Sequence, residues 1–383
     1  GNPIYTDNSY SDSKDLSINK DPYIKNHYTV KGAYIIWQDQ DNLINTGVTY
    51  DQDYLYFNIP QATIRQGNAM LAVHGGTGDN DDILWSWHIW VTDEDTDNKV
   101  TVYNLNHFRY EFMPICLGWC STKEVSSYYP ARTQRVKFTQ NTINGAGGAT
   151  AYMTIRQNHF FTESNTQGYI PVYQWGRKDP IVAANDNSDS AAAWKTVQTP
   201  AGLSVGAGAN CSVADGEGGI PNSIAHPNLF IKGVSGNQDV DNGDWTTDHY
   251  YNLWSARNTS STISDDIVVK TIYDPCPLGY HVPSPSAYSG FTKDGGVTGS
   301  GYANNEHPLV DYANTTGTYS KGWTFYCGTS STSWKTGATL YFTCLNEVFY
   351  STGDLANASY SHYWSAVPRS WTGGLHLFTT MHY

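Results

Sequence analysis

The stretch Ile83–Val91, ILWSWHIWV, decides the fold class of this chain. Its side chains alternate, so that one face carries Ile83, Trp85, Trp87, Ile89 and Val91 and the other carries Leu84, Ser86, His88 and Trp90. A hydrophobic period of two is typical of a β-strand. We therefore expect a strand with Trp85 and Trp87 in the core. His88, on the opposite face, is expected to be a hydrogen-bonded structural residue.

Three earlier runs also have strand character: Lys31–Trp37, Tyr54–Ile59 and Ala69–Val73. The segment between the third run and Ile83 is HGGTGDNDD, which has the composition of a hairpin loop. Short strands at this spacing indicate a small β-sandwich, here of the Ig-like kind. We place it at residues 30–97, after an extended lead-in at residues 1–29.

The rest of the chain, residues 98–383, reads as a second and larger domain. Strand-like pieces alternate there with long loops rich in Gly, Asn, Ser and Asp. Short helices are expected at Asp189–Val197 and Ser284–Phe291. The whole chain is therefore predicted to be mainly β, with a loop-rich α+β domain pinned by buried tryptophans.

Composition favours an exported protein that makes contacts through aromatic side chains. Only 15% of the residues are charged, whereas 14% are aromatic, including 13 Trp and 29 Tyr. The net charge of −13 argues against nucleic acid as a partner, because nucleic-acid binding needs a basic face. No apolar run is long enough to span a membrane. No signal peptide is present, so we expect a mature or recombinant form.

The six cysteines leave two alternatives open, buried thiols or one or two disulfides. The leading pair is Cys327–Cys344, because each residue follows a strand-like aromatic run, GWTFYC and LYFTC. The competing pair is Cys116–Cys120, which only a tight turn could bridge. No CxxC zinc pattern occurs.

Charged segments favour structural roles. In GRKDP, residues 176–180, we expect an ion pair and a Pro-terminated turn, with a site for a sugar carboxylate as the alternative. Acidic loops occur at residues 78–82, 93–98, 185–190 and 238–244. The last of these fails the spacing of a calcium loop, so we expect a solvated loop and no metal site. No hydrolase, zinc-protease, P-loop or dinucleotide motif appears, so neither catalytic residues nor a cofactor are predicted.

Six strings resemble segments of Bacteroides-type fimbrillin-family proteins, in the same order. They are GNAMLAVHGGTGDNDDILWSWHIWVTD (67–93), CLGW (116–119), VYQWGRKDPIV (172–182), HPNLFI (226–231), IYDPCPLGYHVPSP (272–285) and LYFT…STGDL…YWSA (340–366). The C-terminal part is also similar to the major-paralogous (FISUMP) domain. That resemblance implies a C-type-lectin-like fold for residues 98–383. It also makes Cys276 a further disulfide candidate, with Cys327 or Cys344 as its partner.

The resemblance implies a cell-surface adhesin, a fimbrial tip subunit that binds a host or microbial glycan or a protein. Such a protein is found outside the cell or on the outer-membrane surface, lipid-anchored or associated with a pilus. Other pilus subunits are then possible partners. The alternatives are a glycan-capturing lipoprotein of nutrient uptake, a structural pilus subunit and, as the weakest, an enzyme with a fold like that of formylglycine-generating enzymes.

Loops of the second domain are the expected place for a ligand, because loops on a rigid scaffold carry recognition. The loops at 201–223 and 233–250 match no family string. The second one combines aromatic faces for stacking with carboxylates for hydroxyl groups. The candidate ligand-binding residues are Trp245, Tyr250, Tyr251, Asp239, Asp241 and Asp244. The alternative is that this loop folds over the domain, with Trp245 as a buried plug.

Overall fold

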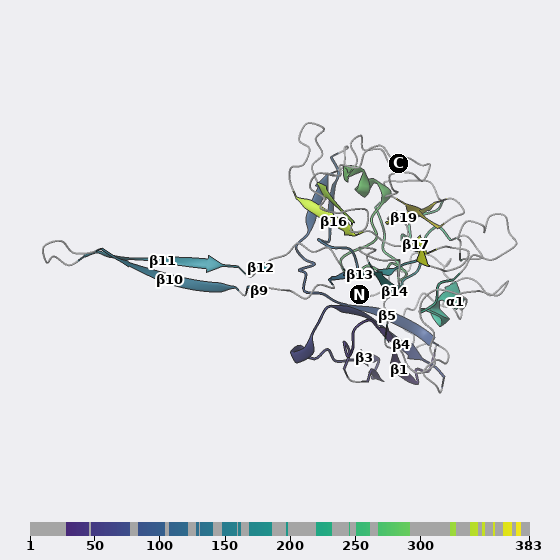
Figure 1. Cartoon of the computed structure of the whole chain (residues 1–383). Helices are drawn as coiled ribbons and strands as arrows, with labels where there is room; N and C mark the ends of the chain where they lie inside the picture. Colours follow the sequence, from purple (N-terminus) through teal and green to yellow (C-terminus); the bar gives the residue numbers. More distant parts are fainter. Residues whose placement is uncertain are drawn as a thin grey trace. The chain divides into compact units, whose positions relative to one another are not determined.

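The computed structural model describes the chain as mainly β, with strands in 43% of the described residues and helices in 7% (Figure 1). The described residues are 28–45, 47–76, 83–103, 107–121, 128–129, 131–140, 148–158, 160–161, 168–185, 197, 220–231, 245, 250–260, 267–291, 322–326, 338–343, 347–348, 355–356, 363–369 and 373–376. The chain divides into two compact units. One comprises residues 1–120 and 168–383, and the other comprises residues 121–167.

The predicted strands form an antiparallel sheet with the order β1-β4-β5. Its strands are β1 (Gly32–Gln38), β4 (Gly67–His74) and β5 (Ile83–Val91), so the strand expected at Ile83–Val91 has the predicted bounds. The Tyr54–Ile59 run contains β3 (Tyr54–Tyr56), which pairs with β2 (Thr49–Asp51).

Both faces of the sheet are covered, which explains why every residue of β4 is buried. One face packs Met70 and Ala72 with Trp37 and with Val182 of β14 (Ile181–Asn185). The other face packs Ala69 and Leu71 with a cluster that includes Leu43, Ile44 and Val48. A central strand buried on both faces favours a continuous apolar run such as AMLAV over strict alternation.

The prediction that Trp85 and Trp87 both lie in the core is wrong for Trp87, which is 36% exposed. Trp87 shares a face with Leu71, but β5 is the outer strand in the described sheet. The cover formed by Leu43 and its neighbours reaches Ile89 and Val91 and does not bury Trp87. Trp85 is half-buried and packs against Tyr273, with 6.4 Å between the ring centroids.

The first unit contains further short elements outside this sheet. They are β6 (Val100–Tyr103), β7 (Arg109–Phe112), β8 (Cys120–Ser121), β13 (Gly168–Val172), β14 (Ile181–Asn185), α1 (Ile220–Ala225), η3 (Pro285–Phe291), β15 (Gly322–Tyr326), β16 (Thr339–Thr343), β17 (Glu347–Val348), β18 (Leu355–Ala356), β19 (Trp364–Arg369) and β20 (Gly373–His376). The 3₁₀ helix η3 confirms the helix expected at Ser284–Phe291. The helix expected at Asp189–Val197 lies outside the described residues, apart from Val197.

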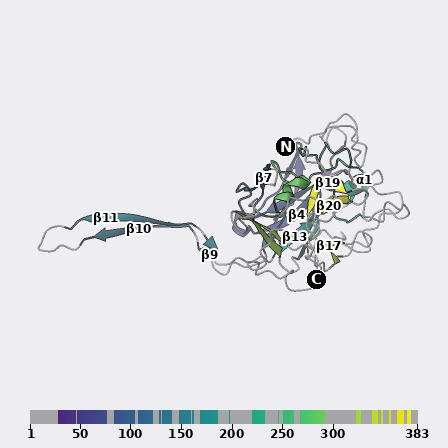
Figure 2. The same cartoon turned by 90° about the horizontal axis from the view of Figure 1, so that it is seen from above.

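Residues 121–167 form a separate unit built around one long hairpin (Figure 2). Its strands β10 (Arg132–Thr139) and β11 (Thr150–Gln157) pair antiparallel along their full length. The short strands β9 (Tyr128–Tyr129) and β12 (Phe160–Phe161) pair with each other. Nothing in the sequence analysis singled out this hairpin.

Whether the two sequence-defined domains are Ig-like and lectin-like, with their boundary at residue 97, stays a prediction. Among the described residues, no helix combines the length and hydrophobicity needed to cross a lipid bilayer.

Candidate ligand-binding cavity

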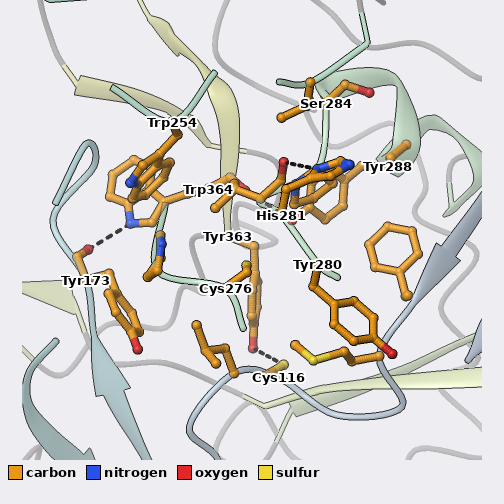
Figure 3. Close-up of a pocket in the computed structure, with 18 of the residues that line it drawn as sticks. Cys116, Tyr173, Trp254, Cys276, Tyr280, His281, Ser284, Tyr288, Tyr363 and Trp364 are labelled. Atoms are coloured by element: carbon orange, nitrogen blue, oxygen red, sulfur yellow. Dashed lines mark hydrogen bonds between the residues drawn. The ribbon is translucent and has the colours of Figure 1, made fainter. Parts of the chain in front are cut away.

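A cavity of about 990 Å³ lies within the first unit, and its walls are dominated by aromatic and aliphatic side chains (Figure 3). Most of its lining comes from five segments far apart in the sequence: the region 108–117, β13 with residues 173–175, the region 275–288, β16, and residues 363–364. The remaining lining residues are Lys99, Phe230, Trp245, Trp254, Ile267, Val268 and Val348. Its aromatic lining includes Phe108, Tyr110, Phe112, Tyr173, Trp175, Trp245, Trp254, Tyr280, Tyr288, Tyr341, Phe342, Tyr363 and Trp364. The volume matches that of small-molecule sites in proteins.

Tryptophan side chains fix the loops that make the wall. The indole N–H of Trp175 donates to the Ser365 carbonyl (3.0 Å), and that of Trp364 donates to the Tyr173 carbonyl (2.8 Å). Trp254 donates to the Arg177 carbonyl at 3.3 Å. The first two bonds tie the loop after β13 to strand β19. Buried tryptophans therefore hold the loops of this unit together, as the sequence predicted.

The GRKDP segment has the structural role that we expected. Arg177 is 2% exposed and donates to the carbonyl oxygens of Leu229, Ser223 and His226 and to Gln174 Oε1. These bonds hold the segment after α1 against residues 174–177. A guanidinium buried in this way is not accessible to the carboxylate of a sugar, so the alternative reading is wrong for Arg177.

Lys178 and Asp179 form a buried ion pair with 2.6 Å between Nζ and Oδ1. The carboxylate accepts a second bond from Ser86 Oγ at 2.8 Å, and Lys178 Nζ lies 4.4 Å from the centre of the Trp85 ring. Burial lowers the pKa of Lys178, and the neighbouring Asp179 opposes that shift. The pair joins the loop after Trp175 to Ser86 on β5, the outer strand of the β1-β4-β5 sheet.

His88 lies behind the cavity wall and is hydrogen-bonded, as predicted. Asn68 uses its amide nitrogen to donate to Asp39 Oδ2 (3.0 Å) and the Gly118 carbonyl (2.9 Å), so its Oδ1 is left to accept from His88 Nε2–H at 2.9 Å. His88 Nδ1 then accepts from the hydroxyl of Tyr173, also at 2.9 Å. Burial lowers the pKa of His88 from 6.5 to about 3, so the imidazole is neutral at physiological pH.

Asp274, in the YDPCP string, organises the segment that carries Cys276 and Tyr280. Its Oδ1 accepts from Lys270 Nζ (2.6 Å) and the Cys276 amide (2.8 Å), and its Oδ2 accepts from the Val282 amide (2.8 Å). A carboxylate with these bonds is committed to holding a turn. The string therefore places the cavity side chains between residues 275 and 284.

The thiols in the cavity are protonated at neutral pH. Cys116 Sγ lies 3.6 Å from the Tyr363 hydroxyl, which itself donates to the Thr343 carbonyl at 2.6 Å. Burial raises the pKa of Cys116 to about 11 and raises that of Cys276 well above its usual range. A nucleophilic cysteine needs the opposite shift, towards the thiolate. The environment of both thiols therefore suits packing and not covalent chemistry.

Cys116, Cys120 and Cys276 form no disulfide, so the competing Cys116–Cys120 bridge is wrong, and so is a bridge from Cys276 to Cys327 or Cys344. Cys120 instead lies buried next to Asn68, with Nδ2 of Asn68 3.3 Å from its sulfur. Cys327 and Cys344 lie outside the described residues, and their pairing stays a prediction. The strands that precede them, β15 and β16, do pair, with Gly322 opposite Thr343.

Trp245, one of the predicted ligand residues, is buried, which agrees with the alternative prediction that it fills the inside of the domain. It is 3% exposed, and its indole donates to the Trp175 carbonyl at 2.7 Å. Its ring packs in the core next to the cavity and offers no open face on a loop. Tyr250 is half-buried against the same cluster, and Tyr251 is half-buried as well. Asp239, Asp241 and Asp244 lie outside the described residues.

Sequence reasoning missed the cavity residues Tyr280, Tyr288 and Tyr363. The Tyr288 hydroxyl donates to the Trp364 carbonyl at 3.1 Å, and burial raises the pKa of Tyr288. Tyr280 is half-buried, and its hydroxyl donates to the Thr96 carbonyl. Two sequence strings could have indicated Tyr280 and Tyr363: YHVP begins at Tyr280, YWSA begins at Tyr363, and both combine aromatic residues with proline or small residues. Within the part of the chain that the structure describes, no cluster of side chains suited to a metal ion occurs.

No protein-family model, curated protein or solved structure matches this chain. Function therefore has to be inferred from the cavity and the sequence.

Proposed function

We propose that this protein is a cell-surface adhesin of the fimbrillin type that binds its ligand in the aromatic cavity. The observation that carries the proposal is the cavity of about 990 Å³, whose aromatic walls are fixed by indole-to-carbonyl hydrogen bonds. A preformed site binds tightly because little conformational freedom is lost when the ligand enters. The site of action would be the outside of the cell or the outer-membrane surface.

The lining indicates a ligand with flat apolar faces and hydroxyl or amide groups. Tyrosine and tryptophan offer apolar area together with a polar tip, which suits the face of a sugar ring or an aromatic side chain of a surface protein. The hydroxyl of Tyr280 and the imidazole of His281 lie among the lining groups that could bind ligand hydroxyls. A neutral glycan or an uncharged segment of a protein is therefore the proposed ligand class.

Two alternatives share this cavity or leave it idle. A glycan-capturing lipoprotein of nutrient uptake would use the same walls, but it would prefer short soluble oligosaccharides over intact cell surfaces. A structural pilus subunit would bind other subunits and would not need the cavity. Binding to immobilised glycans, to soluble oligosaccharides and to whole cells separates these three functions.

The test is binding of the purified protein to a glycan array and to a panel of surface proteins, repeated with Tyr280→Ala. Tyr280 lines the cavity, whereas Tyr56 is 51% exposed on β3 and does not line it. Tyr56→Ala therefore serves as the matched control. We expect Tyr280→Ala to lose the signal and Tyr56→Ala to keep it. Binding that survives Tyr280→Ala in a folded protein, or that disappears with Tyr56→Ala, would contradict the proposal.

A further inference from the structure

The β10–β11 hairpin has two chemically different faces. Residues paired across antiparallel strands share a face, and the faces alternate along each strand. The register puts Val136 opposite Met153, with Phe138 opposite Ala151 and Gln134 opposite Ile155, all on one face. The other face carries Arg135, Lys137, Tyr152 and Arg156 among threonines, with Arg135 4.0 Å from the centre of the Tyr152 ring. The hairpin is thus an amphipathic ribbon.

The apolar face is open in the structure. Phe138 is 51% exposed, Met153 is 47% exposed and Ile155 is 48% exposed. A two-stranded hairpin is only marginally stable in water unless a further strand or surface covers its apolar side. Neighbouring apolar side chains that remain open on such a ribbon mark an interaction surface.

Charge separates the hairpin unit from the rest of the chain. Residues 121–167 contain five basic and two acidic residues, a net charge of +3, which leaves 17 basic and 33 acidic residues elsewhere, a net charge of −16. The two long strands themselves carry Arg132, Arg135, Lys137 and Arg156 and no acidic residue. Any acidic surface with an apolar border would therefore attract this hairpin.

The first unit offers such a surface beside the cavity. Residues 93–97, DEDTD, carry four exposed carboxylates, and Thr96 of this turn accepts the hydroxyl of the cavity residue Tyr280. Partial burial and, to a smaller extent, the neighbouring Asp93 raise the pKa of Glu94. Two exposed apolar residues line the cavity, Phe108 (58% exposed) and Ile267 (74%), and a third, Leu278 (79%), lies two residues before Tyr280. We call the acidic turn and these three residues the acidic rim.

From this complementarity we infer that the β10–β11 hairpin is a docking arm that binds the acidic rim of a second copy of this chain. Phe138, Met153 and Ile155 cover the apolar residues of the rim. Arg132 shares the apolar face, and Arg135, Lys137 and Arg156 on the other face add to the positive potential of the arm, which attracts the carboxylates of the turn. A second copy is favoured as the partner because the chain itself supplies exposed carboxylates and exposed apolar residues, and because the first unit and the hairpin carry opposite net charge. The inference does not depend on the proposed ligand binding.

Sedimentation velocity of the full chain tests this, over about a hundredfold range of protein concentration, because self-association follows mass action. Three variants are compared with the wild type: Arg135→Glu with Lys137→Glu on the hairpin, Asp93→Lys with Asp95→Lys on the rim, and Lys31→Glu with Arg65→Glu as a control. Lys31 and Arg65 are exposed basic residues outside the hairpin, so the control changes the net charge as much as the hairpin variant does.

The wild type and the control should associate, and association should weaken when salt rises from about 0.05 M to about 0.5 M. The hairpin variant and the rim variant should each raise the dissociation constant at least about tenfold, because each pair of substitutions cancels the net charge of its surface and so removes the attraction. An equimolar mixture of these two variants should associate again. A wild type that stays monomeric, charge-reversed variants that associate normally, or a mixture that does not recover would each overturn the inference. A monomeric wild type that binds phosphatidylserine vesicles through Arg135 and Lys137 would identify a lipid surface as the partner instead.

Discussion

Lowering the pH should destabilise this protein through His88. The imidazole is held neutral between Asn68 and Tyr173, and its pKa falls from 6.5 to about 3 because it is buried. In the unfolded chain the same group regains its ordinary pKa, so the unfolded state binds an additional proton below pH 6.5. The stabilisation is therefore present above pH 6.5 and is lost as the pH falls from there towards 3.

The magnitude follows from the shift itself. Each pH unit below the unfolded pKa costs about 1.4 kcal/mol while the folded imidazole stays neutral. Between pH 6.5, the unfolded value, and pH 5.0, His88 should therefore reduce the free energy of unfolding by up to about 2 kcal/mol. A loss of this size is a large fraction of the stability of an ordinary domain.

The assay is urea unfolding at pH 7.5 and pH 5.0 for the wild type and for His88→Gln. Glutamine can donate to Asn68 and accept from Tyr173 but does not titrate, so the difference between the two proteins isolates His88 from the carboxylates. An NMR titration of His88 in the folded wild type gives an independent result, and no protonation is expected above pH 5. Parallel loss of stability in both proteins, or a folded His88 that titrates near 6.5, would refute the reasoning.

Three further predictions concern the core and the thiols. Trp37→Ala should lower the free energy of unfolding by about 3–5 kcal/mol, because Trp37 is fully buried. Trp87→Ala should lower it by only about 1 kcal/mol, because Trp87 is 36% exposed. Equal urea midpoints for the two variants would contradict the packing. Arg177→Met should lower the free energy of unfolding by at least about 2 kcal/mol, because four buried acceptors lose a charged donor. The control Arg65→Met, at the surface, should leave the urea midpoint unchanged. An Arg177→Met variant as stable as the wild type would show that these acceptors find other hydrogen-bond donors. With a pKa raised to about 11, Cys116 should react with iodoacetamide at pH 8 far more slowly in the folded than in the unfolded protein, and mass spectrometry that finds equal rates would place this thiol at the surface.

The local part of the fold was predictable from the sequence. The bounds of β5 follow from its period of two, and the roles of His88 and the GRKDP segment were predicted correctly from residue type and context. Burial was predicted less well, because it depends on what the rest of the chain places over a strand or loop. Trp87 is exposed although it lies on the apolar face, and Trp245 is buried although it lies in a loop.

The cavity could not be predicted, since its walls are made of segments separated by up to hundreds of residues. The Cys116 sulfur lies 3.6 Å from the Tyr363 hydroxyl oxygen, yet no sequence spacing relates these two residues. The hairpin β10–β11 was missed for a different reason. Its strands, RTQRVKFT and TAYMTIRQ, alternate apolar and polar residues as a β-strand does. Polar residues are so frequent in both strands, however, that the apolar pattern is weak.

Hydrogen–deuterium exchange with and without ligand tests the central claim most directly, that the aromatic cavity is the binding site. The ligand is the strongest hit from the glycan and protein panels. We predict slower exchange in two segments distant in the sequence, residues 272–288 and 363–367, because both contribute side chains to the cavity wall, and no change at residues 54–56 of β3. Protection confined to β3 or to the hairpin, with both cavity segments unchanged, would contradict the account.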